Sequence, residues 1–374
     1  MRSEPGAVEQ VAARDQRRWT RGLTLVLLLA LAVAMTPPAW TRAVAFATVA
    51  DGLDLAVPRP FAPAIERGVG DAGGVEVDRY GPQGWADAAQ APPAIVVVPG
   101  AAPSGRRDTR VVALSEAIAR AGRVVVVPEL EVYGEDLVPA DIDRIASVVA
   151  ALAPAHGPVV LVGVSFGGSL SLVAAADPAV GAQLALVATF GAYADLGGVV
   201  QAATTGVSLV DGEALPWAGD PRAADVVRDQ MLGLLEEDEA DAVAEALAGD
   251  ADPARLSDDL RAVHDLLAND DPTRTPALIA QVPNVVRDRI GEVSPAQAGD
   301  GLEVPLIALH AVDDPVIPYG ELVRLGSVFP HAEQLTLTTF DHVGVDDQRE
   351  TRWWVTVQDL WRATAFVARV LSAS

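Results

Sequence analysis

Residues 158–168 read PVVLVGVSFGG and combine three features in a fixed order. An apolar run comes first, which is typical of a strand buried on both faces. A serine between two glycines follows, and the small residues after it favour a helix. Gly163 and Gly167 stand where a side chain would collide with a neighbouring strand or helix. The stretch therefore predicts a tight strand-to-helix turn that exposes the Ser165 hydroxyl at the edge of a sheet.

From residue 75 onward, strand-like and helix-like segments alternate along most of the chain. This alternation predicts an α/β fold with a mainly parallel central sheet and helices on both faces. Predicted strands lie at 75–78, 95–98, 124–127, 159–164, 184–190, 305–310 and 334–340, and predicted helices at 111–121, 141–153 and 355–371.

The stretch 191–300 breaks this rhythm because it is long, rich in aspartate and helical in its apolar spacing. We expect it to form a helical lid inserted into a core made of 75–190 and 301–374. Its larger apolar residues either shape a substrate pocket or form the lid's own core, and helical spacing alone does not separate the two. They are Trp217, Met231, Leu232, Leu234 and Leu235.

These motifs together make the chain resemble the α/β-hydrolase superfamily of esterases, lipases and dienelactone hydrolases. The resemblance covers roughly 75–190 and 302–371 and leaves the insertion and the N-terminus unmatched. It implies the chain order serine, acid, histidine, with the acid after a late strand and the histidine after the last one.

The acid position is occupied by two aspartates. The strand at 305–310 is followed by Ala-Val-Asp-Asp-Pro-Val-Ile-Pro, which is similar to the acid loop of the family. The spacing to Pro318 favours Asp314 over Asp313, which then serves as a loop or capping residue. In a chain this acidic, two exposed loop aspartates without a catalytic role are the alternative interpretation.

The histidine that directly follows the last predicted strand is His342, which we expect to be the general base. Asp314 would accept a hydrogen bond from one ring nitrogen, and the other would take the proton of Ser165. His331, before that strand, is the fallback. His310 closes the strand at 305–310 and reads as a structural histidine.

The family also implies two backbone N–H donors that hold the oxyanion of the reacting acyl group. Phe166 is the first, since it follows the nucleophile. The second is Ala101, with Ala102 as the alternative. Here the sequence departs from the family, because Pro99-Gly100 stands where His-Gly is usual. The segment 105–108 reads as the entry to the next helix.

The resemblance implies a serine hydrolase that cleaves carboxylic esters through an acyl-enzyme. A serine peptidase or lactonase uses the same groups. A non-catalytic, membrane-tethered binding protein with this fold is the alternative from another class. We expect no metal and no cofactor, because the sequence has no cysteine and no His-x-x-x-His pair. A small acyl compound is the expected partner.

The net charge of −24, with no lysine in the chain, argues against nucleic acid as a partner. At the N-terminus, an arginine-bearing tail (1–22) precedes an apolar segment (23–40) and a linker rich in Ala, Pro and Gly (41–74) that has room for one short helix. The apolar segment reads as an uncleaved membrane anchor or as a signal peptide cleaved near Ala43-Val44-Ala45. Either interpretation places the core outside the cytoplasm, anchored to the membrane or secreted.

Overall fold

The computed structural model describes residues 37–52, 64–87, 91–101, 104–134, 138–339 and 353–373. Within these ranges the chain forms one eight-stranded sheet in the order β1-β2-β4-β3-β5-β6-β9-β10. The strands β4, β3, β5, β6, β9 and β10 run parallel, and β1 and β2 pair antiparallel at one edge. Their bounds are Ile65–Ala72 (β1), Val75–Pro82 (β2), Ala94–Val98 (β3), Val124–Pro128 (β4), Val159–Val164 (β5), Leu184–Phe190 (β6), Leu306–Ala311 (β9) and Glu333–Leu337 (β10). The mainly parallel sheet predicted from the apolar runs is confirmed.

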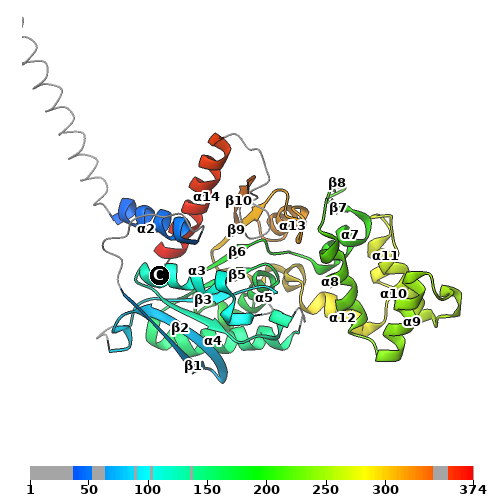
Figure 1. Cartoon of the computed structure of the whole chain (residues 1–374), viewed down its shortest axis with the longest axis horizontal. Coiled ribbons are helices and arrows are strands. Elements are labelled where there is room, and N and C mark those ends of the chain that lie inside the picture. The colour runs from blue at the N-terminus through cyan, green and yellow to red at the C-terminus, as the bar shows by residue number, and fades with distance from the viewer. Residues whose placement is uncertain are drawn as a thin grey trace, which may run out of the picture.

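Helices cover both faces of this sheet, as the burial of alternate strand residues requires. One face packs against α4 (Ala140–His156), α5 (Phe166–Ala175), α6 (Pro178–Gly181) and α13 (Gly320–Val328). The other packs against α2 (Pro37–Gly52), α3 (Thr109–Arg120) and α14 (Trp353–Ser372). Consecutive residues of β3 show the alternation, since Val96 belongs to the first core and Val97 to the second. In Figure 1, α2 and α14 lie together above the sheet.

Two elements occupy parts of the predicted linker at 41–74, and its middle, 53–63, lies outside the described residues. Helix α2 starts at Pro37 and packs against α14 and α3. Strand β1 pairs with β2 through a hairpin turn whose residues, Gly73 and Gly74, both have positive φ. Neither element has a clear apolar period, since α2 is built mostly of small residues and β1 is an exposed edge strand with two glycines. Their position is set by their neighbours rather than by their own pattern.

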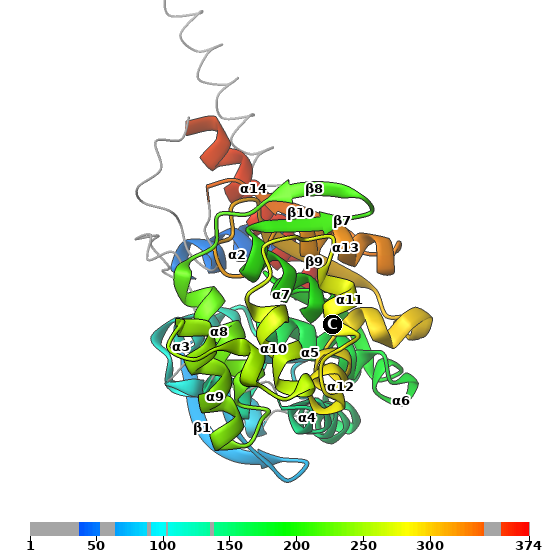
Figure 2. The ribbon, with the colours of Figure 1, turned by 90° about the vertical axis from the view of Figure 1, so that its right-hand side faces the viewer.

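The segment between β6 and β9 projects beyond one end of the sheet (Figure 1) and faces the viewer in Figure 2. Its elements are α7 (Leu196–Thr205), β7 (Val207–Val210), β8 (Glu213–Pro216), α8 (Pro221–Leu232), α9 (Glu237–Ala248), α10 (Asp258–Leu267), α11 (Thr275–Ile279) and α12 (Asn284–Glu292). The helices agree with the sequence pattern, whereas the β7–β8 hairpin was not predicted. Its role as a lid stays a prediction.

The predicted apolar segment at 23–40 lies outside the described residues except for its last four, which begin α2. Of the helices the structure describes, none combines the length and apolar character needed to cross a bilayer.

Candidate active site

Ser165 lies on the tight turn between β5 and α5, as the sequence predicts. Its φ of 54° and ψ of −132° fall in a region that side chains rarely adopt. The two flanking glycines allow this turn. A Cβ on Gly163 would collide with the backbone of Gly168, and one on Gly167 would collide with the carbonyl of Pro99. The Ser165 N–H donates to the carbonyl of Phe190 at 2.8 Å, which fixes the turn to the end of β6.

Ser165 follows the carboxyl end of β5, and Asp314 follows the carboxyl end of β9, with β6 between the two strands. Parallel strands bring these ends to one edge of the sheet, which is where open α/β sheets carry their sites. The strand order, the antiparallel β1–β2 edge and the strained serine turn after β5 occur together. The chain has the α/β-hydrolase fold.

Asp314 is buried in a turn that binds one of its oxygens firmly. Its Oδ1 accepts hydrogen bonds from the backbone N–H groups of Val316 at 2.8 Å and Ile317 at 2.9 Å. The indole N–H of Trp217, just after β8, donates to the Asp314 carbonyl at 2.8 Å. Asp313 is exposed to solvent. Of the two predicted acids, only Asp314 therefore has a side chain fixed inside the protein.

Two other histidines, His310 and His331, bear on the predicted acid and base positions. His310 is buried, with Nε2 3.0 Å from the Ile317 carbonyl and 3.6 Å from Asp314 Oδ2. It supports the acid loop from below, which agrees with a structural histidine. The Nε2 of His331 lies 3.2 Å from the carbonyl of Val304, which precedes β9. His331 is thus at the opposite end of β9 from Asp314, which rules it out as the fallback base.

His342 lies outside the described residues, so its role as base stays a prediction. The chain just before it is held firmly, because Oδ2 of the buried Asp359 in α14 accepts from the N–H groups of Thr338 and Thr339 at 2.7 and 2.6 Å. The Thr339 hydroxyl donates to the same oxygen at 2.9 Å. Sequence analysis missed Asp359, although an aspartate within the apolar stripe of a helix is a signal for such a buried cap.

The loop after β3 packs directly against the nucleophile. A methyl group on Gly100 would lie 2.6 Å from Ser165 Cβ and 3.2 Å from its Oγ. Ala101 lines the cavity in front of Ser165, and Phe166 is the first residue of α5, where backbone N–H groups have no partner within the helix. Ala102, the alternative donor, lies outside the described residues. The loop and the helix thus converge on Ser165, as an oxyanion hole requires.

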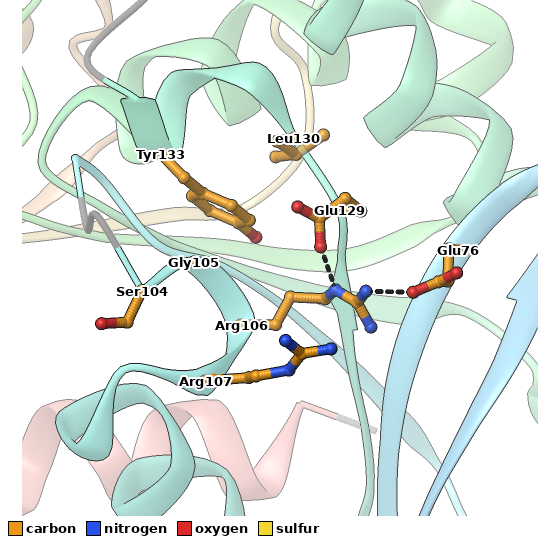
Figure 3. Close-up of a pocket in the computed structure, with 8 residues that line it drawn as sticks. All are labelled: Glu76, Ser104, Gly105, Arg106, Arg107, Glu129, Leu130 and Tyr133. Carbon is orange, nitrogen blue, oxygen red and sulfur yellow. Dashed lines mark hydrogen bonds and ion pairs between the residues drawn. The ribbon is translucent and has the colours of Figure 1, made fainter.

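Figure 3 shows what holds this loop from behind. Arg106 is buried, and its guanidinium donates to Asp78 Oδ1 at 2.7 Å and to Glu76 and Glu129. Burial acts to lower the pKa of Arg106, but the bonds to Glu129 and Glu76 outweigh it and leave the pKa raised. Sequence analysis read 105–108 only as a helix entry, which Asp108 fulfils by capping α3. The carboxylates lie 23 to 30 residues away, so no local pattern revealed them.

A cavity of about 540 Å³ opens in front of Ser165. Most of its described lining is aliphatic. It comes from the sheet, from α8 (Ala223, Val226 and Val227), and from α2 and α14 (Thr48, Val49, Ala363, Phe366, Val367 and Val370). Met231 and Leu232, two of the predicted pocket residues, pack instead in the larger core. No group of three or more acidic or histidine side chains that could hold a metal ion occurs among the described residues.

No protein-family model and no curated protein matches the sequence. Solved structures with a similar fold include an esterase/lipase from an uncultured bacterium, with a TM-score of 0.44 and 13% identity over 90% of this chain and 89% of that one. A Pyrobaculum calidifontis esterase has a TM-score of 0.48 and 14% identity over 89% and 91%. A puromycin-hydrolysing peptidase of Mycobacterium tuberculosis has a TM-score of 0.49 and 17% identity over 85% of this chain and 41% of that one. The activities in these names are those of the other proteins.

Proposed function

We propose that the protein is a serine hydrolase that cleaves carboxylic esters of small or medium acyl groups. The observation that carries the proposal is the strained Ser165 turn, packed against the loop after β3 and on the same sheet edge as the buried Asp314. Strain at a polar residue in a turn of this kind marks a functional site. The aliphatic cavity in front of Ser165 favours an apolar acyl group.

In this mechanism Ser165 attacks the acyl carbonyl while His342 takes its proton. The N–H groups of Phe166 and Ala101 bind the developing oxyanion. His342 then protonates the leaving alcohol, and the acyl group remains on Ser165. Water, activated by the same histidine, releases the acid. Asp314 orients the histidine throughout.

A fluorophosphonate probe tests the nucleophile. We expect it to label the protein covalently and to lose that labelling in Ser165→Ala. Ser372→Ala, at an exposed serine near the end of α14, is the matched control and keeps the labelling. Absence of labelling in the unmodified chain would favour the non-catalytic binding protein. A panel of p-nitrophenyl esters, lactones and aminoacyl amides then separates esterase from lactonase and peptidase.

We further propose that the segment 23–40 anchors the protein to a membrane with the catalytic core outside the cytoplasm. The arginines of the preceding tail support this orientation, since positive charge stays on the cytoplasmic side. Mass spectrometry of the mature N-terminus separates an uncleaved anchor, which keeps Met1 or Arg2, from a signal cleaved near Ala45.

A further inference from the structure

Helices α2 and α14 present an exposed apolar surface that the proposed catalysis does not use. We call it the aromatic face, and it consists of Phe46 on α2 with Trp354, Val357 and Trp361 on α14. Trp361 is 61% exposed and Val357 is 55% exposed. Large side chains exposed to this degree and gathered on one surface indicate an interaction site rather than scatter.

The face is continuous across the two helices. The α14 residues are spaced by three and four positions, which places them on one stripe of the helix. On α2, Arg42 and Phe46 are four residues apart and share a stripe in the same way. The Arg42 guanidinium lies 5.8 Å from the centre of the Trp361 ring, which joins the two stripes through a cation–π contact.

The opposite sides of the same helices wall the cavity in front of Ser165. Thr48 of α2, and Phe366 and Val370 of α14, line that cavity. An α-helix that is apolar on two opposite sides needs a second apolar environment besides the protein core. The protein core buries the inner side of α14. Its outer apolar side, which belongs to the aromatic face, stays exposed.

The sequence before α2 indicates what that environment is. The uncharged apolar run 23–35 ends just before Pro37, where α2 begins, and five arginines precede it. If this run enters a bilayer, α2 lies at the bilayer surface. Tryptophan is enriched at that depth, and an arginine beside it keeps its charge in the headgroup layer. The chain as a whole has a net charge of −24, which disfavours contact with anionic lipid and favours a neutral lipid surface.

We propose that the aromatic face lies against the headgroup region of a lipid bilayer, so that α2 and α14 separate the membrane from the cavity. This inference rests on the proposed membrane anchor at 23–40 and does not depend on the proposed catalysis. It commits to lipid as the occupant rather than to the chain's own apolar segment or to a second copy.

The absence of cysteine allows a direct test on the full chain. Val357→Cys carries a single fluorescent label on the aromatic face. Val69→Cys, at a valine of β1 that is 68% exposed, and Val285→Cys, at a valine of α12 that is 50% exposed, are the matched controls. Each labelled chain is reconstituted into phosphatidylcholine vesicles. Quenching is measured with nitroxide-bearing lipid and, separately, with aqueous iodide.

We expect the label at 357 to lose most of its emission to the lipid-borne quencher and little to iodide, with the reverse at 69 and 285. Iodide quenching at 357 equal to that at 69 would overturn the proposal, because the face would then lie in water. Protection of 357 from both quenchers would also overturn it, because protein, either residues 23–35 or a second copy, would then cover the face. Activity is not needed for any of these outcomes.

Discussion

The chain between β3 and α3 borders two cavities of similar volume and opposite chemistry. The one behind it, about 470 Å³, is lined largely by charged and polar groups around Arg106 (Figure 3). The one in front, about 540 Å³, is mostly aliphatic and contains Ser165. On the Arg106 side, charged groups fix the loop through directional hydrogen bonds. On the Ser165 side, the aliphatic walls form few hydrogen bonds, so a substrate can enter without breaking any.

The difference teaches how an open apolar site keeps a defined shape. Aliphatic contacts are not directional, so they would not by themselves hold Gly100 and Ala101 against Ser165. The hydrogen bonds from Arg106 to three carboxylates supply this direction, and the carboxylates lie on β2 (Glu76 and Asp78) and just after β4 (Glu129). Four substitutions test whether the Arg106 side fixes the loop while the aliphatic side binds the substrate. Their expected effects decrease in the order in which they follow.

Arg106→Ala should have the largest effect. It removes the guanidinium that pairs with the buried Asp78 and with Glu76 and Glu129, so three carboxylates would lie together without this positive charge. Removing one partner from a buried ionic network costs about 3–5 kcal/mol. Chemical denaturation measures this loss in the free energy of unfolding. Arg107→Ala, at the exposed neighbouring arginine, should change it by less than about 0.5 kcal/mol. Equal effects of the two substitutions would mean that the network does not hold the loop.

Gly100→Ala tests the contact between the loop and the nucleophile. The added methyl group would meet Ser165, so the loop must move and take the Ala101 N–H with it. Loss of one oxyanion donor lowers kcat by roughly a hundredfold or more. Ester hydrolysis measures the loss. Gly68→Ala, where a Cβ meets nothing within 4 Å, is the control. Unchanged kcat in Gly100→Ala would contradict the proposed oxyanion hole.

Glu321→Gln sharpens the comparison, because Glu321 is a buried carboxylate with far less compensating charge than those around Arg106. Burial raises its pKa to about 7, although Arg324 acts in the opposite direction. Its Oε2 accepts from the N–H groups of Ala194 and Asp195, where the segment 191–305 begins.

A raised carboxyl pKa means that the folded protein binds this proton more tightly than the unfolded chain. The contribution of Glu321 to stability is therefore full below the unfolded pKa, near 4.5, and is lost as pH rises through 7. Between about pH 5 and pH 7 we expect the free energy of unfolding of the unmodified protein to fall by about 2 kcal/mol. The Glu321→Gln variant should not show this fall. Unfolding titrations at several pH values measure it, with Glu237→Gln, at an exposed glutamate, as control. An identical pH profile in the Glu321→Gln variant would contradict the raised pKa.

Val226→Trp should have the smallest effect, because it changes only the aliphatic cavity in front of Ser165. The larger side chain fills part of the cavity from α8. We expect kcat/KM to fall by roughly tenfold for an octanoyl ester and to stay unchanged for an acetyl ester. Val285→Trp, on the exposed side of α12, should alter neither value. An equal loss on both esters would indicate that the cavity does not bind the acyl chain.

The central strands and the serine turn could be predicted because their signals are local. A buried parallel strand is an unbroken apolar run, and the turn at Ser165 requires glycine at fixed positions. The β7–β8 hairpin also had a local signal that went unread. Asp211 and Gly212, both with positive φ, form the Asp-Gly pair typical of such a turn.

The supports of the site could not be predicted, because they depend on which strands become neighbours. Arg106 meets Asp78 only because β2 pairs antiparallel with β4. Asp359 reaches Thr338 and Thr339 only because α14 packs back on β10. The apolar stripe around Asp359 marks it as buried, but the partners of both side chains follow from the tertiary fold and leave no periodic trace in the sequence.

The bond from the Trp217 indole to the Asp314 carbonyl links the end of the β7–β8 hairpin to the acid loop. Through this bond, a displacement of Trp217 would act on the backbone that bears the carboxylate. In a variant whose other six tryptophans are replaced by phenylalanine, Trp217 would be an optical reporter: its emission would shift when its hydrogen bond breaks and would record motion at the acid without an added dye.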